Sequence, residues 1–127
     1  MKCFELALQE ELGDFVDRVA RDACAAAPGL GCERARGLID LVLRTRLRRC
    51  AACARENECG CERPGRHLHD DARELANICA SNAADLVDRG TVRDGVEARL
   101  SSVLYRAFAP VVVDGRECHA SAGTRGR

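Results

Sequence analysis

The feature that most constrains the fold is a set of four apolar stripes with helical spacing, separated by glycine and proline. Within each stripe the apolar residues recur mostly three or four positions apart, which places them on one face of an α-helix. Such a face must be buried against another element. The stripes are Leu8, Leu12, Phe15, Val19 and Ala23; Ile39, Leu43, Leu47, Cys50 and Ala54; Leu75, Ile78, Cys79, Ala83 and Leu86; and Val92, Val96, Leu100, Val103 and Ala107.

Helix-ending residues between the stripes predict four helices joined by short loops. The loops are short enough to make neighbouring helices antiparallel, so the sequence predicts an all-α protein, a small bundle of about four helices. Asp71 and Glu74 have the spacing of a capping box, and Thr91 is expected to cap the last helix. The expected boundaries are Pro28-Gly29 for the end of the first helix, about 32–55 for the second, Asp70 or Asp71 to Gly90 for the third, and Thr91 to Pro110 for the fourth.

The segment after the fourth helix is expected to be extended. Val111-Val112-Val113 followed by Asp114-Gly115 indicates a short strand and a turn. A single strand needs a partner, so we expect it either to pair across a homodimer or to pack on the bundle. The length of 127 residues indicates one domain, residues 1–120, followed by a disordered tail, residues 121–127.

Six potential metal ligands lie within twenty residues, in the order C-x2-C-x5-C-x-C-x5-H-x-H. They are Cys50, Cys53, Cys59, Cys61, His67 and His69. Thiolates and imidazoles are the donors that zinc prefers. The cluster spans the loop between the second and third helices, so it predicts a structural zinc ion that clamps this hairpin. Disulfides, an iron–sulfur cluster and unliganded thiols are the alternatives, and Cys24 and Cys79 lie on helical faces where a small buried hydrophobic residue fits.

Charge is unevenly distributed although the chain is neutral overall. Residues 1–31 have a net charge of −3 and residues 32–56 a net charge of +4. This asymmetry is typical of neighbouring helices with complementary faces. A second interpretation is a basic docking surface for an acidic partner, formed by Arg44, Arg48, Arg49 and Arg55 on the polar side of the second helix.

Composition excludes several classes of protein. No apolar run is long enough to span a membrane, and the acidic N-terminal residues are unlike a secretory signal. Nine cysteines then indicate a reducing, intracellular compartment, cytoplasmic or nuclear. Lys2 is the only lysine among 20 basic residues, as expected from a GC-rich genome such as that of an actinobacterium or a large DNA virus. No nucleophile or phosphate-binding loop has a supporting motif, so we expect no enzymatic activity.

Three short patterns define alternatives. The spacing Cys50-x2-Cys53-x5-Cys59 resembles the last three cluster ligands of WhiB-like iron–sulfur regulators, which implies a nucleic-acid-associated transcription regulator whose first ligand is Cys24 or Cys32. Residues 12–17 (LGDFVD) resemble the BH3 core of Bcl-2-type proteins and residues 93–96 (RDGV) the start of their BH1 segment, which implies a viral apoptosis regulator. The C-x2-C pair also allows a thiol-redox protein.

Taken together, the patterns favour a small regulatory or adaptor protein with a structural zinc site. We expect it to bind another macromolecule, a protein in preference to a nucleic acid, and to act outside the membrane.

Overall fold

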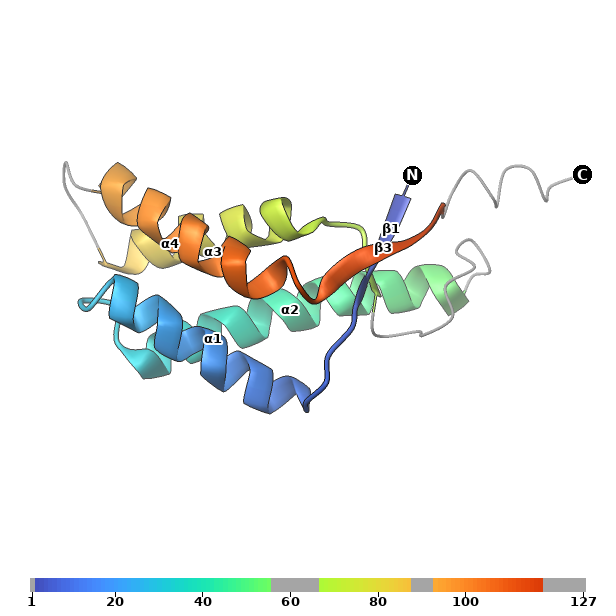
Figure 1. Ribbon diagram of the computed structural model, residues 1–127, viewed down its shortest axis with the longest axis horizontal. Helices are drawn as coiled ribbons and strands as arrows, with labels where there is room; N and C mark the ends of the chain where they lie inside the picture. The colour runs from blue at the N-terminus through green and yellow to red at the C-terminus, as the bar shows by residue number, and fades with distance from the viewer. Residues whose placement is uncertain (1, 56–66, 88–92, 118–127) are drawn as a thin grey trace, which may run out of the picture.

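The computed structural model describes residues 2–55, 67–87 and 93–117, and it confirms a small helical bundle. The described part is elongated, with the helices along its long axis and a small sheet crossing at one end (Figure 1). The helices are α1 (Leu12–Ala26), α2 (Cys32–Arg55), α3 (Ala72–Val87) and α4 (Arg93–Phe108), and the strands are β1 (Lys2–Leu6), β2 (His67–Leu68) and β3 (Val112–Glu117).

The bundle consists of two helical hairpins. The most extensive helix contacts join α3 to α4 and α1 to α2, and α1 also packs on α4. The contact between α2 and α3 is less extensive. The two hairpins therefore pack on each other more extensively through α1 and α4 than through α2 and α3.

Leu, Val and Ala side chains form the core, as the apolar stripes predict. Nearly all members of the stripes that lie in described helices are buried or half-buried, and the exception is Leu86, which is 43% exposed. Phe15 of α1 and Phe108 of α4 are both fully buried, and their ring centroids are 6.0 Å apart in a tilted arrangement. This aromatic pair joins the two hairpins.

A three-stranded antiparallel sheet in the order β2-β1-β3 closes one end of the bundle. The sequence predicted neither β1 nor β2, because each is short and its partner is remote in the chain. In the central strand β1, Glu5 pairs with His67 on one side and with Val113 on the other. The extended segment after α4 therefore finds its partner within the same chain.

The predicted turn at Asp114-Gly115 is wrong, because β3 continues through both residues to Glu117. Pairing with β1 keeps this segment extended, and the register shifts between Lys2 and Phe4, as at a β-bulge. The first helix is also shorter than its stripe: α1 begins at Leu12, so Leu8 precedes it and packs against the core from the connecting segment. The predicted bounds of α2 match those observed. Residues 121–127 and the predicted cap Thr91 lie outside the described residues.

The predicted capping box at the start of α3 is present. The Glu74 amide donates to Asp71 Oδ1 at 2.8 Å, and the Asp71 amide donates to Glu74 Oε1 at 3.5 Å. We expect Asp71→Ala to lower the free energy of unfolding by about 1 kcal/mol, because it leaves a helix N-terminal amide without a partner. Urea unfolding would measure this loss, and the exposed Asp22→Ala in α1 should stay within about 0.5 kcal/mol of the wild type. Equal losses for both variants would contradict a capping role.

Candidate functional site

Two of the six predicted metal ligands have described side chains, and they flank Leu68 at the sheet end of the bundle. His67 lies in β2 and His69 directly follows it. His67 is fully buried, and it is the only buried polar side chain among those whose burial the structure describes. Neither of its ring nitrogens has a hydrogen-bond partner among the described atoms. Because a buried imidazole without partners is costly, this position calls for a ligand or a special role.

Burial is the main reason why the pKa of His67 is lowered from its ordinary value. The neighbouring His69 lowers it further, and Glu5 on the paired strand acts in the opposite direction. The ring is thus held in its neutral form, which is the form that binds metals.

The other predicted ligands cannot be placed as side chains. Cys50 and Cys53 lie in the last turns of α2, which also contacts β2, and Cys59 and Cys61 lie outside the described residues. Within the described part of the chain, no group of three or more His, Cys, Asp or Glu residues could hold a metal ion. The six-ligand zinc site therefore stays a prediction, with His67 its best-supported member.

An ion pair also links α2 to the segment before α3, close to His67 in the sequence. The Arg46 guanidinium lies 3.5 Å from the Asp70 carboxylate, so the middle of α2 is tied to the segment just before α3. Both side chains are largely shielded from solvent, which strengthens an ion pair relative to one at the surface.

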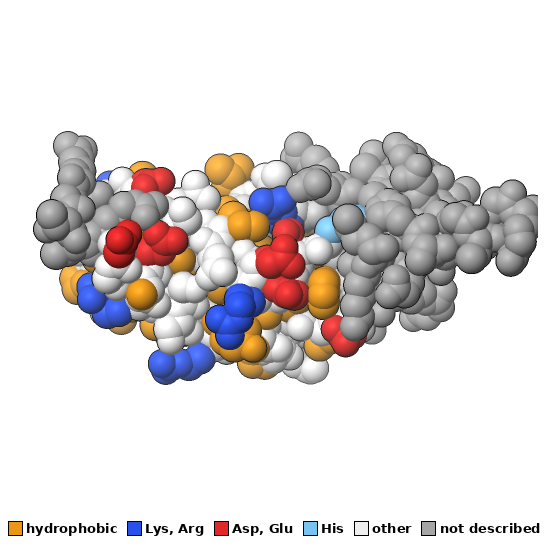
Figure 2. All heavy atoms as spheres, turned by 90° about the horizontal axis from the view of Figure 1, so that it is seen from above, with side chains coloured by type: hydrophobic (Ala, Val, Ile, Leu, Met, Phe, Trp, Pro, Cys, Tyr) orange, Lys and Arg blue, Asp and Glu red, His pale blue; other side chains and the backbone are white. Residues whose placement is uncertain are grey.

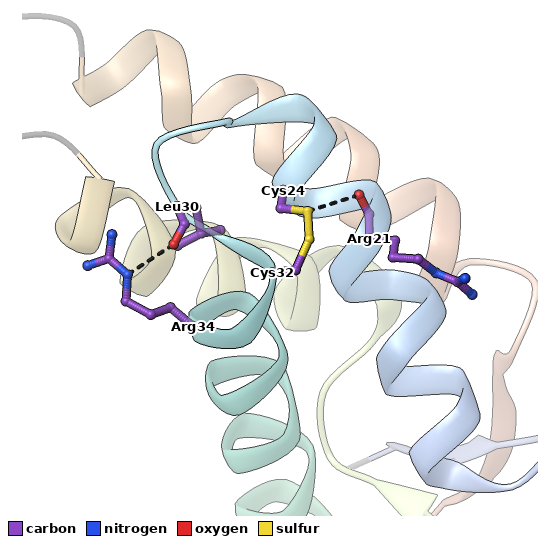
Figure 3. Close-up of a disulfide and its surroundings, with 5 residues drawn as sticks. All are labelled: Arg21, Cys24, Leu30, Cys32 and Arg34. Atoms are coloured by element: carbon purple, nitrogen blue, oxygen red, sulfur yellow. Dashed lines mark hydrogen bonds between the residues drawn. A yellow bond between two sulfur atoms is a disulfide. The ribbon is translucent and has the colours of Figure 1, made fainter.

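Cys24 and Cys32 form a disulfide across the loop between α1 and α2 (Figure 3). This differs from the expectation that Cys24 is simply a buried thiol, and neither residue is free to serve as the first ligand of an iron–sulfur cluster. The short Pro28-Gly29 loop brings the last turn of α1 beside the first turn of α2, which places the two Cα atoms 5.3 Å apart. Leu30 and Arg34 order the same loop, since Arg34 Nε donates to the Leu30 carbonyl at 3.0 Å.

Cys79 is the only free cysteine among those whose side chains the structure describes. Burial raises the pKa of its thiol to about 12, and the charge of Arg46 opposes this only in part. Cys79 is therefore protonated and inert at neutral pH, as predicted for a small buried hydrophobic residue.

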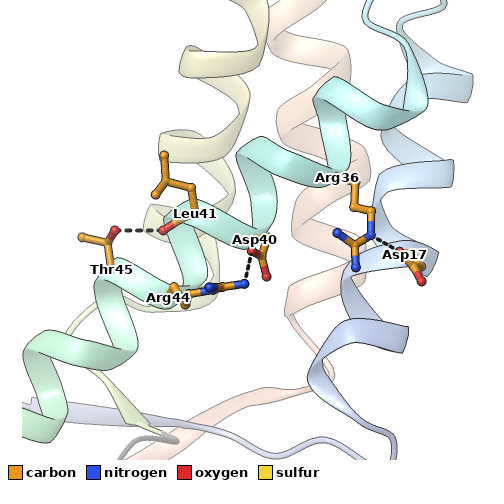
Figure 4. A network of polar contacts seen from close by, with 6 residues as sticks. All are labelled: Asp17, Arg36, Asp40, Leu41, Arg44 and Thr45. Atoms are coloured by element: carbon orange, nitrogen blue, oxygen red, sulfur yellow. Dashed lines mark hydrogen bonds and ion pairs between the residues drawn. The ribbon is translucent and has the colours of Figure 1, made fainter.

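The predicted basic docking surface is described only at Arg44. This side chain is 65% exposed and forms an ion pair of 2.6 Å with Asp40, one turn earlier on the same helix (Figure 4). Arg48, Arg49 and Arg55 belong to α2, but their side chains lie outside the described residues. Two turns earlier on α2, Arg36 forms an ion pair with Asp17 of α1, in agreement with the predicted complementary helix faces.

A cavity of about 670 Å³ lies between α1 and α2 and is lined mainly by charged side chains. Two of its three arginines are engaged in ion pairs, Arg18 with Glu10 and Arg36 with Asp17. On the face seen in Figure 2, acidic and basic side chains are also intermixed, without a dominant sign. These surfaces present balanced charge.

Two of the segments that carry sequence resemblances lie on helices of the bundle. In the segment that resembles a BH3 core, Phe15 and Val16 are fully buried on α1 and face the protein's own core. The C-x2-C pair lies near the C-terminal end of α2, whereas reactive cysteines are typically found at helix N-termini. Neither arrangement favours the corresponding alternative function.

The fold and its surfaces define a small, cysteine-rich helical bundle with a minor sheet. No protein-family model matches the chain, and no curated protein or solved structure is detectably similar to it. Among the described residues, no helix is both long enough and apolar enough to cross a membrane.

Proposed function

We propose that this chain is a small non-enzymatic regulatory or adaptor protein that binds another protein through α2. The observation that carries the proposal is the position of Arg44, which projects from α2 and forms its ion pair within its own helix, at Asp40. Arg36 is neutralised by Asp17 of α1 and Arg44 by Asp40 of its own helix, so the basic excess of α2 rests on the other arginines of its sequence, among them Arg48, Arg49 and Arg55. An exposed basic surface of this kind favours an acidic partner.

The balanced charge of the cavity between α1 and α2 supports a binding role in preference to catalysis. Two of the arginines that line the cavity between α1 and α2 pair with carboxylates that also line it, so their charges are compensated within the cavity. Active sites instead gather groups whose pKa values are shifted for proton transfer.

A structural zinc ion is the second part of the proposal. His67 supports it, because a neutral, buried imidazole with both nitrogens unpartnered is suited to metal coordination. The cysteines Cys50 and Cys53 would supply thiolates from the end of α2, and Cys59, Cys61 and His69 are the remaining candidates. An ion held in this way would fix the end of α2 relative to β2 and α3, so its role would be structural.

Differential capture of proteins from host-cell extract tests the docking role of α2. The double variant Arg44→Glu/Arg48→Glu should lose proteins that the wild type retains, because it reverses the charge of the surface. The matched variant Arg21→Glu/Arg18→Glu, on α1, changes charge by the same amount and should retain them. Nuclease treatment during capture separates protein partners from nucleic acid.

Two outcomes would contradict the proposal. Identical protein sets for the wild type and both variants would show that α2 is not the docking element. Capture that disappears after nuclease treatment would instead support the nucleic-acid-associated regulator, whose binding should also fall steeply with salt.

A further inference from the structure

An apolar groove of about 300 Å³ lies between α2 and α3, where the two hairpins contact each other least. Val42 is buried at its base, Leu38 and Ile78 are half-buried, and Leu41 is 63% exposed. Leu41 is the most exposed large apolar side chain in the described part of the chain. Figure 4 shows Leu41 and Thr45 on the flank of α2 opposite Arg36.

Polar side chains in the groove are already satisfied by their own helices. The Thr45 hydroxyl donates to the Leu41 carbonyl at 2.8 Å, and Asn82 Nδ2 donates to the Ile78 carbonyl at 2.8 Å. Their donors are therefore not directed at a ligand. Recognition here is expected to rely mainly on apolar contact, which disfavours a small polar metabolite and favours aliphatic side chains of a partner.

The groove follows the direction of the two helices that form it. Leu38, Leu41 and Thr45 recur along α2 with helical spacing, and Ile78 and Asn82 do so along α3. One turn beyond Asn82 the same row of α3 reaches Leu86, which is 43% exposed. Two parallel rows of this kind match an amphipathic helix, which inserts residues at positions i, i+3 or i+4, and i+7.

Charge distinguishes between the occupants that such a groove could take. Of the described residues, Arg46 is the only charged one that lines it, and Arg46 is paired with Asp70. Arg44, which is paired with Asp40, belongs to the same helix outside the lining. Helix α2 as a whole contains seven arginines against Glu33 and Asp40. A second copy docked symmetrically on this face would bring two basic helices together, which is unfavourable. The occupant should instead carry carboxylates beside its apolar stripe.

We propose that the groove between α2 and α3 binds an amphipathic helix of a partner protein, with aliphatic residues facing Leu38, Leu41 and Ile78 and carboxylates facing the arginines of α2. This inference rests on the proposed protein-binding function and specifies its partner class.

Fluorescence anisotropy with three designed peptides tests the inference on the full chain. The first peptide is a helix with a leucine stripe and a glutamate flank, the second has the same composition with a scrambled stripe, and the third has lysine in place of glutamate. Binding is expected for the first peptide, and at least about tenfold weaker binding for the other two. Methyl shifts at Leu38, Leu41 and Ile78 in NMR spectra should locate the first peptide in the groove.

Protein variants supply the matched controls. Leu41→Ala should weaken binding of the first peptide by about tenfold or more. Its melting temperature should stay close to that of the wild type, since the side chain is exposed and alanine favours helix. Val113→Ala truncates another exposed aliphatic residue, on β3, and should change affinity by less than about twofold.

The outcomes distinguish two hypotheses: that the groove between α2 and α3 is the binding site, and that the basic surface of α2 is the docking element. No binding of the first peptide below about 1 mM, or binding insensitive to Leu41→Ala, overturns the groove. If the first peptide binds equally well to wild type and Leu41→Ala but not to Arg44→Glu, the basic surface of α2 remains the docking element. Self-association that Leu41→Ala abolishes would show that the occupant is a second copy and would overturn the assignment to a foreign helix.

Discussion

Phe108→Ala is expected to lower the free energy of unfolding by about 4 kcal/mol, a large effect even for a core truncation. Phe108 is fully buried at the end of α4, and its ring contacts that of Phe15 on α1. Truncation removes apolar contact and leaves a cavity between the two hairpins, which closely packed neighbours can fill only in part. Urea unfolding followed by circular dichroism would measure the loss, with an unchanged m-value as the sign that both states are otherwise retained.

Phe4→Ala provides the matched control for this prediction. Phe4 lies in β1 and is only partly buried against the core, so the same truncation there should cost about half as much or less. A loss for Phe108→Ala no greater than that for Phe4→Ala would show that the Phe15–Phe108 pair is not the centre of the core.

Removal of zinc is expected to lower the melting temperature of the zinc-loaded protein by roughly 10 °C or more. The ion would tie the end of α2 to β2, and His67 would be left buried without a partner when it is removed. Differential scanning calorimetry with and without a chelator measures the effect, and native mass spectrometry identifies the bound species from its added mass. An iron–sulfur cluster or paired thiols would give different masses.

Ligand variants refine this test. Cys53→Ser should melt at a lower temperature than the wild type with zinc present and should respond little to the chelator, because the site is already impaired. Cys79→Ala loses a buried side chain of similar size but should keep the full chelator response. Identical melting of the wild type with and without chelator, together with a mass that shows no bound metal, would exclude a structural zinc ion.

The helices could be predicted because their determinants are local. The bounds of α2 follow from Gly31 before it and the glycine- and proline-containing segment after it, and the start of α3 follows from the side-chain chemistry of Asp71 and Glu74. The sheet could not be predicted in this way. In β1 a run of five residues pairs with partners that lie far along the chain, and no local signal records such pairing.

The groove could not be predicted for a related reason. The main apolar stripe of α2 leaves out Leu41, which lies beside Asp40 and close to Arg44 in the sequence. Leu38, Leu41 and Thr45 form a second row whose meaning depends on the placement of Ile78 in another helix. Sequence spacing predicts that His67 is a metal ligand. Its burial could not be predicted, because it arises from the pairing of β2 with β1 in the tertiary structure.

Pairing between β1 and β3 has a consequence for synthesis on the ribosome. Strand β1 is translated first but must await β3, made after all four helices, before its second edge is filled. The helical hairpins have mainly nearby partners and can form while the chain is still emerging. Final closure of the sheet is therefore a late event, and until then the backbone groups along that edge of the nascent chain depend on water or a chaperone for protection.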